Sequence, residues 1–307
     1  MQDNNSCVSS EFTIYVIDFF CYLRALNSTF YPYRLFMARK KIINSGSSVQ
    51  YKIIIYLILI LFGYLVYKCG GSRVSVAEKI DKLEIPATQG ATGQLIVREG
   101  YTLSYNPQRL IPNWVAYELT SLETQGDEPR GEHFKKDPEI KGLQAEVSDY
   151  RNSGWDKGHM APAADMKWSE RAMDDCFYLT NICPQDHKLN TGAWKKLEEQ
   201  CREYARYFGT VYIVCGPIVE NNRYGTIGDN GVMVPDGFFK VILAPYYGEY
   251  KGVGFLFENK KGGKKLVEHA VTIDEVERVT GIDFFHSLPD DVEDVVEAEI
   301  EKSVWNL

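Results

Sequence analysis

The chain has 307 residues, of which 45% are hydrophobic and 25% are charged, and its formal net charge is −8. This composition is that of a folded globular protein and excludes a low-complexity or fibrous chain. The acidic balance argues against a protein that binds nucleic acid through its overall charge, so any phosphate-binding surface has to be local.

An uncharged apolar run occupies residues 53–67 and is bordered by Lys52 and Lys68. Its length matches the apolar core of a signal sequence or of a short signal anchor. Basic residues are more frequent before the run than after it, which places the N-terminus in the cytoplasm and the remainder outside. We therefore expect an extracytoplasmic protein that is secreted or is anchored in the membrane through residues 53–67. The alternative is a buried strand or helix.

Composition divides the chain into four parts. We expect an N-terminal extension (1–52), the apolar signal or transmembrane segment (53–67), a linker with the domain entry (68–105) and one folded domain (106–307). This length is ordinary for a single domain with its own core.

Apolar runs between turn residues predict strands over residues 114–119, 176–181, 211–215, 238–244 and 253–257. Apolar residues recur at intervals of three and four over residues 191–208, which predicts a helix with one apolar face. A short helix is expected over 273–280, with Thr272 as its N-cap, and an acidic helix in 290–302. Strands outnumber helices, so the sequence predicts an α+β fold.

Four of the seven cysteines lie in the second half of the chain: Cys176, Cys183, Cys201 and Cys215. Two interpretations stay open for them, namely two disulfides in an exported domain or free buried thiols. A zinc site built from His159, Cys176, Cys183 and His187 is a weaker alternative, because the spacing is irregular and lacks a CxxC pair.

The segment DKGHMAPAAD, residues 156–165, carries the strongest chemical signal. His159 can accept a proton near neutral pH. We expect a tight turn at residues 157–159, where small neighbours let a bulky ligand approach the imidazole. A lone histidine in such a turn is usually structural, and a second segment shifts the interpretation toward function.

That second segment places Asn190, Trp194, Glu198 and Arg202 at four-residue steps along one side of the predicted helix. An amide oxygen such as that of Asn190 suits Mg²⁺, which keeps most of its waters. Arg202 can bind a phosphate, although a surface ion pair with Glu198 is the alternative. Trp194 is expected in the core. One base, one ligand for a hard metal and several cations predict a phosphodiester-cleaving site.

Two quoted segments, DKGHMAPAAD (156–165) and FYLTNICPQDHKLNTGAWKKLEE (177–199), resemble the DNA/RNA non-specific endonuclease family, the ββα-metal nucleases that include endonuclease G. The resemblance extends over roughly residues 110–285. It implies a ββα-metal nuclease fold with a central antiparallel sheet flanked by helices. It also implies an endonuclease that hydrolyses DNA and RNA with Mg²⁺, or Mn²⁺ as a substitute, and leaves 5′-phosphate ends. Part of the family forms homodimers.

The resemblance implies a role for each matching residue. His159 corresponds to the general base, and Asn190 to the direct ligand of the metal. Glu198 corresponds to a residue that supports the waters around the metal, and Asn181 to a residue that supports the site.

Three cations complete the expected site. Arg202 corresponds to the arginine one turn beyond the glutamate, and Arg130 to an upstream arginine that no tight motif anchors. Lys157 stands where the family usually has arginine. Lysine keeps the positive charge but lacks the two-pronged guanidinium, so we expect a weaker grip on phosphate.

The alternative from another functional class is a catalytically silent nucleic-acid-binding or envelope protein that retains the fold. Lys157 and the acidic net charge favour it slightly. The intact set of His159, Asn190 and Glu198 argues against it, because a silent site has no physical need for all three.

Overall fold

The computed structural model describes residues 82–87, 93–260 and 265–307. Contacts divide the chain into two units, residues 1–72 and 73–307, and every described residue belongs to the second. The predicted N-terminal extension and the apolar segment 53–67 lie outside the described residues. Within the part that is described, no helix combines the length and the apolar character needed to cross a membrane.

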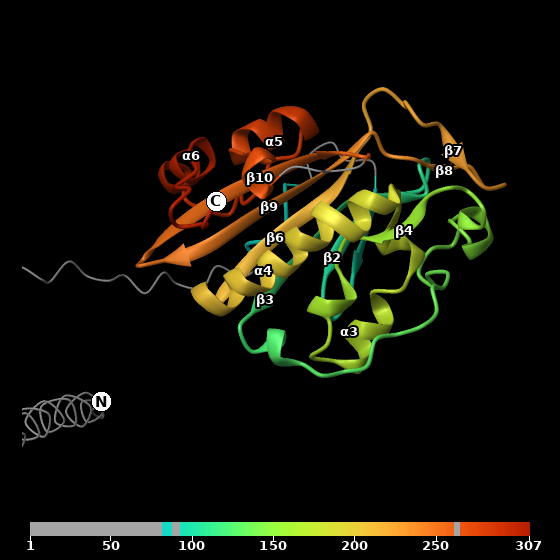
Figure 1. The fold of residues 1–307 in the computed structure, drawn as a ribbon, viewed down its shortest axis with the longest axis horizontal. Coiled ribbons are helices and arrows are strands. Elements are labelled where there is room, and N and C mark those ends of the chain that lie inside the picture. The colour runs from blue at the N-terminus through green and yellow to red at the C-terminus, as the bar shows by residue number, and fades with distance from the viewer. Residues whose placement is uncertain (1–81, 88–92, 261–264) are drawn as a thin grey trace, which may run out of the picture. The chain divides into compact units, whose positions relative to one another are not determined.

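A seven-stranded antiparallel sheet, in the order β1-β2-β3-β6-β9-β10-β11, forms the centre of this unit (Figure 1). In chain order its strands are β1 (Gln94–Val97), β2 (Thr102–Asn106), β3 (Ile111–Thr120), β6 (Thr210–Ile218), β9 (Gly237–Tyr246), β10 (Glu249–Glu258) and β11 (Ala270–Val271). β3, β6, β9 and β10 contain four of the predicted strands, which are therefore confirmed. The prediction of an α+β chain with a central antiparallel sheet is also confirmed.

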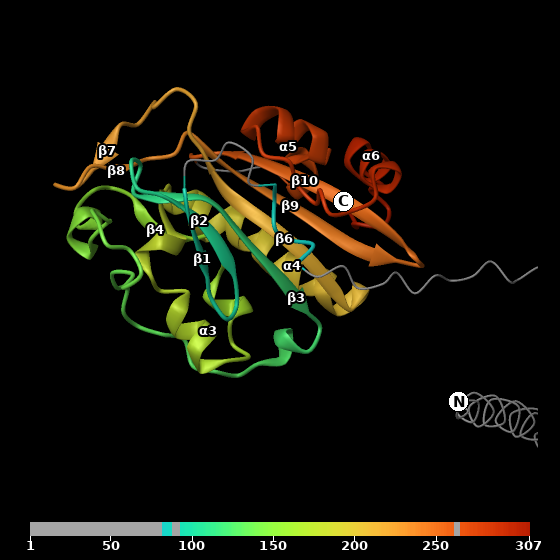
Figure 2. The ribbon, with the colours of Figure 1, turned by 180° about the vertical axis from the view of Figure 1, so that it is seen from behind.

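Helices cover both faces of the sheet. They are α3 (Glu170–Asp175), α4 (Lys195–Phe208), α5 (Ile273–Thr280) and α6 (Asp290–Ala298). Alternate side chains of β6 point to opposite faces: Ile213 and Cys215 pack in the cluster that includes the buried side of α4, whereas Tyr212 and Val214 pack with α5 and α6. α4 lies in front of the central strands in Figure 1, and the strands lie in front of α4 in Figure 2.

The two C-terminal helices begin much as the sequence predicts. α5 covers the expected residues, and the Thr272 side chain accepts a hydrogen bond from the backbone N–H of Glu275 at 3.2 Å, as an N-cap does. α6 ends at Ala298 and is shorter than the predicted acidic helix. Gly254 in β10 allows α5 to approach, because a Cβ there would lie 2.6 Å from Val276.

The motif around His159 forms a strand, not the predicted turn. β4 (Asp156–His159) pairs antiparallel with β5 (Ile182–Gln185) in a separate two-stranded sheet. Gly158 is required there, because a Cβ would lie 2.3 Å from the side-chain oxygen of Gln185. A further small sheet joins β7 (Thr226–Ile227) and β8 (Val232–Met233).

The predicted strand over 176–181 is wrong as well. Residues 179–181 form a 3₁₀ turn, and the strand begins only after them, running through Pro184. Pro184 pairs with Lys157 within this strand and does not end it. A proline lacks the N–H of a strand residue, but a short two-stranded ladder has an open edge at which that loss is tolerated.

The predicted helix over 191–208 is confirmed from Lys195 onward. Before it, Leu189–Trp194 forms a wide π-type turn that Gly192 interrupts with φ −110° and ψ −106°. Such irregular turns re-aim side chains at functional sites. The turn therefore gives Asn190 a direction that a regular helix would not.

The four cysteines in the second half of the chain, Cys176, Cys183, Cys201 and Cys215, are free and buried. The structure thus selects the thiol interpretation over the disulfides. Burial raises the pKa of Cys201 to about 12 and that of Cys215 to about 11. At neutral pH these groups are small apolar residues of the core.

Candidate active site

Six of the seven residues singled out in the sequence line one pocket of about 270 Å³: Arg130, Lys157, His159, Asn190, Glu198 and Arg202. The pocket lies where β4, the turn before α4 and the first turns of α4 meet. Asn181, the seventh, lies behind it. The fold therefore gathers residues that are far apart in sequence around one opening.

His159 is a buried, neutral imidazole. Its side chain lies between two aromatic rings, with ring centres 5.3 Å away for Phe134 and 5.1 Å for Phe177. Burial, helped by the nearby Arg130 cation, lowers the pKa of His159 to about 3. Nε2 is buried and has no hydrogen-bond partner among the described residues. In the tautomer that carries its proton on Nδ1, this nitrogen is an acceptor with no competing partner among the described residues.

The backbone on either side of His159 is held by hydrogen bonds. Trp194 Nε1 donates to the His159 carbonyl at 3.3 Å. Asn181 accepts from the Ala161 N–H and donates to the carbonyls of Ala161 and Cys176, each at 2.9 Å. Asn181 therefore acts on the pocket only through the chain segment that it fixes.

Asn190 is oriented by a carboxylate. Its side-chain nitrogen donates to Oδ2 of Asp156 at 2.9 Å, and the same oxygen lies 2.9 Å from Nδ1 of His187. Because this bond uses the amide nitrogen, the amide oxygen is left for a cation. Asp156 thus fixes the orientation of the Asn190 amide, as outer carboxylates do for the ligands around metal sites.

Arg202 pairs with Asp165 and not with Glu198. Its Nη1 lies 2.6 Å from Oδ1 of Asp165, a fully buried carboxylate that also accepts a hydrogen bond from the Tyr117 hydroxyl at 3.0 Å. Burial raises the pKa of Asp165, and the Arg202 cation opposes that rise. The alternative of a surface ion pair between Glu198 and Arg202 is therefore not what the structure contains.

A buried lysine completes the charge set below the pocket. Lys240 of β9 is fully buried, and its Nζ lies 4.6 Å from the centre of the Trp194 ring. Burial raises the pKa of Glu198 to about 7, while the cations of Lys240 and Arg202 oppose the rise. Burial alone would lower the pKa of Lys240, whereas Cys215, Cys201, Glu198 and Asp165 raise it above its ordinary value. Of these neighbours, the carboxylates of Asp165 and Glu198 are the ones that favour the charged ammonium.

Two cations at the pocket have no carboxylate partner among the described residues. Lys157 Nζ lies 5.2 Å from the centre of the Phe134 ring, and Arg130 Cζ lies 5.3 Å from that of Phe177. Aromatic faces hold such cations without neutralising them. Both are available for an anion that enters the pocket.

Sequence reasoning missed the roles of Asp156, Asp165 and Lys240. Both aspartates belong to the quoted motif, but their partners come from α4 and the turn before it. A lysine between apolar residues, in FFKVIL, is the signal that would have identified Lys240, because an unpaired charge is rarely placed inside a sheet.

The zinc interpretation finds no support in the described residues. Cys183 is buried in the core, whereas the His187 side chain is 70% exposed and hydrogen-bonded to Asp156. Within the described part of the chain, one group of three or more potential ligands comes together, and it lies elsewhere, on α5 and α6.

The sequence model described as DNA/RNA non-specific endonuclease matches residues 81–291. The chain belongs to this family. The family prediction is therefore confirmed, and the prediction of an endonuclease agrees with it.

Named relatives agree with the family. The chain is 36% identical to "Nuclease EXOG, mitochondrial" of Xenopus laevis over 70% of its own length and 64% of the relative's. It is 37% identical to human "Endonuclease G, mitochondrial", covering 62% of this chain and 69% of that one. The chain thus spans less than two thirds of the Xenopus relative.

The fold has a solved counterpart in the EndoG/EndoGI complex, whose crystal structure is described as showing the mechanism of EndoG inhibition. The TM-score is 0.61 at 28% sequence identity, covering 66% of this chain and 89% of the other. The large antiparallel sheet is therefore shared with a nuclease of known structure.

The predicted extracytoplasmic, secreted or membrane-anchored location is wrong. The relatives EXOG and endonuclease G, and a Saccharomyces cerevisiae nuclease that is 35% identical, are all named as mitochondrial. Residues 53–67 lie outside the described residues, and the length and flanking charges of an apolar run are not by themselves sufficient to assign a compartment. The comparisons also give no support to a membrane partner or to a homodimer.

Proposed function

We propose that the chain is a metal-dependent, sugar-non-specific endonuclease that hydrolyses phosphodiester bonds of DNA and RNA and leaves 5′-phosphate ends. The observation that carries the proposal is one pocket with a neutral His159, an oriented amide oxygen on Asn190 and cations without acidic partners. Family membership supports the reaction class.

The residues present fit a divalent cation such as Mg²⁺, or Mn²⁺ in its place. Asn190 offers an amide oxygen fixed by Asp156, and Glu198 lies two turns further along on the same pocket. A hard cation held by one protein oxygen keeps several waters, which this polar pocket accommodates. When bound, the cation neutralises charge that develops on the phosphate oxygens.

His159 acts as the general base at Nε2, taking a proton from the attacking water. The nitrogen is unprotonated at neutral pH, since burial and Arg130 disfavour the imidazolium. A phosphate in the pocket brings negative charge near the ring and raises the pKa of His159 toward the range of an effective base. The histidine is therefore strengthened as a base by its own substrate.

The cations bind and orient the phosphate. Lys157 and Arg130 face the pocket without carboxylate partners, so their charge is available to the substrate. Arg202 also lines the pocket, but its pairing with Asp165 fixes its position and reduces its free charge. Lys157 and Arg130 thus contribute most to the affinity for the phosphate, and Arg202 contributes most to its orientation in the pocket.

Digestion of plasmid DNA and of RNA by the full chain tests this proposal, with Mg²⁺, with Mn²⁺ and with chelator. We expect cleavage of both polymers with either metal, none with chelator, and ends that a kinase labels only after phosphatase treatment. Binding of nucleic acid without cleavage under every metal condition would instead identify a silent binding protein.

A further inference from the structure

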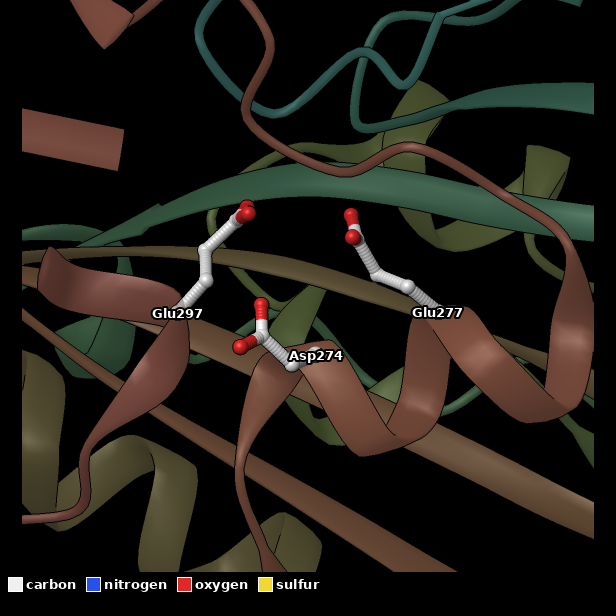
Figure 3. A group of neighbouring side chains, drawn as sticks. All are labelled: Asp274, Glu277 and Glu297. Atoms are coloured by element: carbon white, nitrogen blue, oxygen red, sulfur yellow. The ribbon is translucent and has the colours of Figure 1, made fainter. Parts of the chain in front are cut away.

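A second group of acidic side chains lies on the sheet face opposite α4, where α5 and α6 pack. Figure 3 shows Asp274 and Glu277 of α5 and Glu297 of α6 pointing toward one another. Their ligand oxygens all lie within 4.8 Å of one another. This group, the α5–α6 acidic cluster, lies outside the pocket described above.

The positions of the three residues within their helices bring the carboxylates together, and for one of them the position is electrostatically unfavourable. Asp274 and Glu277 are three apart and so share one side of α5. Asp274 is in the first turn of its helix, where negative charge is favoured. Glu297 is in the last turn of α6, where the helix dipole disfavours it. Local helix electrostatics therefore do not account for Glu297.

Glu297 carries an unsatisfied buried oxygen. The residue is 6% exposed, and its Oε1 is buried without a hydrogen-bond partner among the described residues. In Glu277, by contrast, Oε1 accepts from the Phe284 backbone N–H at 2.7 Å. A buried carboxylate oxygen that is left unpaired is destabilising. Glu297 points into the cluster, so its missing partner belongs there.

The surrounding charges do not compensate this carboxylate. Burial raises the pKa of Glu297 to about 9, and the neighbouring Glu277, Glu293 and Asp274 raise it further. Burial likewise raises the pKa of Glu277 to about 7. Arg278, which follows Glu277 directly in the sequence, pairs with Glu275 instead. A cation from outside the chain would therefore supply the positive charge that the neighbouring residues do not.

We propose that Asp274, Glu277 and Glu297 bind a divalent cation of the Ca²⁺ class, which fastens α6 to α5. Three carboxylates form an all-oxygen ligand set, whereas zinc prefers nitrogen and sulfur. Two oxygens on one ion lie at most twice the metal–oxygen distance apart, about 4.6–5.2 Å for Ca²⁺ and about 4.0–4.2 Å for Mg²⁺. The ligand oxygens all lie within 4.8 Å of one another, which is compatible with the longer metal–oxygen distance of Ca²⁺. Asp274 is exposed and provides the entry path.

Thermal unfolding of the full chain with increasing CaCl₂ tests the site. The parent is the Asn190→Ala variant, so that calcium at the cleavage pocket does not contribute. We expect a saturable rise in Tm of about 5–10 °C at calcium concentrations near 100-fold above Kd. Isothermal titration with CaCl₂ should give one ion per chain. Because neither readout uses cleavage, the result does not depend on the proposed nuclease activity.

Glu297→Gln in the same parent should abolish the calcium-dependent rise, and its Tm without calcium should exceed that of the parent. Asp274→Asn should also lose the rise. Because Asp274 is exposed, this variant tests the site even if the buried Glu297→Gln variant misfolds. Glu299→Gln, an exposed neighbour, is the matched control and should keep it. Absence of a rise in the parent, or an equal rise after Glu297→Gln or Asp274→Asn, would overturn the site.

Discussion

Two groups of carboxylates lie on opposite faces of the same sheet and differ in the charges that surround them. Below the cleavage pocket, Asp165 and Glu198 have Arg202 and Lys240 beside them, and burial raises the pKa of Glu198 only to about 7. At the α5–α6 acidic cluster, the strongest neighbouring charges are further carboxylates, and the pKa of Glu297 is raised to about 9.

The difference concerns where the compensating charge comes from. The pocket contains fixed cations from the protein, so its geometry is complete before substrate or metal arrives, as preorganised catalysis requires. The acidic cluster lacks such cations and depends on a proton or on an added ion. A buried carboxylate is therefore compensated by the protein itself in the pocket, whereas in the acidic cluster it depends on a proton or an ion from solution.

Removing the buried cation should have the largest effect. Lys240→Met leaves Asp165 and Glu198 without one of their positive neighbours, which should lower the free energy of unfolding by about 3–5 kcal/mol. Urea titration followed by tryptophan fluorescence measures this. Lys251→Met is the matched control, because that partly exposed lysine pairs with Glu249 and Glu301 at the surface and should change stability by less than about 1 kcal/mol. Equal destabilisation by both variants would contradict the comparison.

Loss of the carboxylate that orients Asn190 should act on metal use more than on folding. With Asp156→Ala, we expect the Mg²⁺ concentration for half-maximal cleavage to rise by about 10–100-fold, with most of the rate recovered at saturating metal. Initial rates over a Mg²⁺ series measure this. Asp186→Ala removes a nearby carboxylate that caps the same turn without contacting the Asn190 side chain, and it should leave the Mg²⁺ midpoint close to wild type. An unchanged Mg²⁺ midpoint in Asp156→Ala would contradict a role for Asp156 in metal binding.

The acidic cluster should make stability fall as pH rises. The folded state retains a proton on Glu297 that the unfolded state releases above its ordinary pKa. The free energy of unfolding therefore decreases as pH rises from about 4.5 to about 9. The negative charges of Glu277, Glu293, Asp274 and Asp283, which face the same region, further raise the pKa of Glu297. Chelated protein should lose several degrees of Tm between about pH 5 and about pH 8. Glu297→Gln should reduce this slope, and an unchanged slope would show that Glu297 does not carry it.

The smallest expected effect concerns the lysine in the motif. Lys157→Arg restores the guanidinium that the family usually has, and we expect a KM for DNA that is lower by about 2–10-fold with little change in kcat. Steady-state cleavage of a labelled duplex measures both constants. A higher KM would mean that the pocket is shaped for lysine, with Phe134 and Tyr150 lying 5.2 and 5.7 Å from its Nζ.

Local patterns predicted much of this molecule. The long strands β3, β6, β9 and β10 and the capped helix α5 follow from apolar runs and from Thr272, since each depends on nearby residues. The motif residues could be grouped by resemblance, and six of them line one pocket. The four-residue spacing of Glu198 and Arg202 correctly indicated that both lie on one side of α4, whereas Asn190 reaches the pocket from the irregular turn before that helix.

The failures all depend on distant partners. β4 is a strand only because β5, more than twenty residues later, pairs with it and tolerates Pro184. Arg202 lines the pocket, but its ion pair is with Asp165 from another segment and not with Glu198, the alternative that the helix spacing offered. The acidic cluster joins Glu297 to residues of another helix that lie 20 or more positions earlier in the chain, so neither helix pattern alone could reveal it.

The most direct test of the central claim compares cleavage and binding in the same variant. His159→Ala should lower single-turnover cleavage of a labelled duplex by about 10²–10⁴-fold. Its affinity for that duplex, measured by fluorescence anisotropy in chelator, should stay within about threefold of wild type, because the neutral imidazole contributes little charge. His286→Ala, at an exposed histidine, should change neither. Cleavage by His159→Ala within tenfold of wild type, or a loss of binding that accounts for its lost cleavage, would contradict the assignment of His159 as the base.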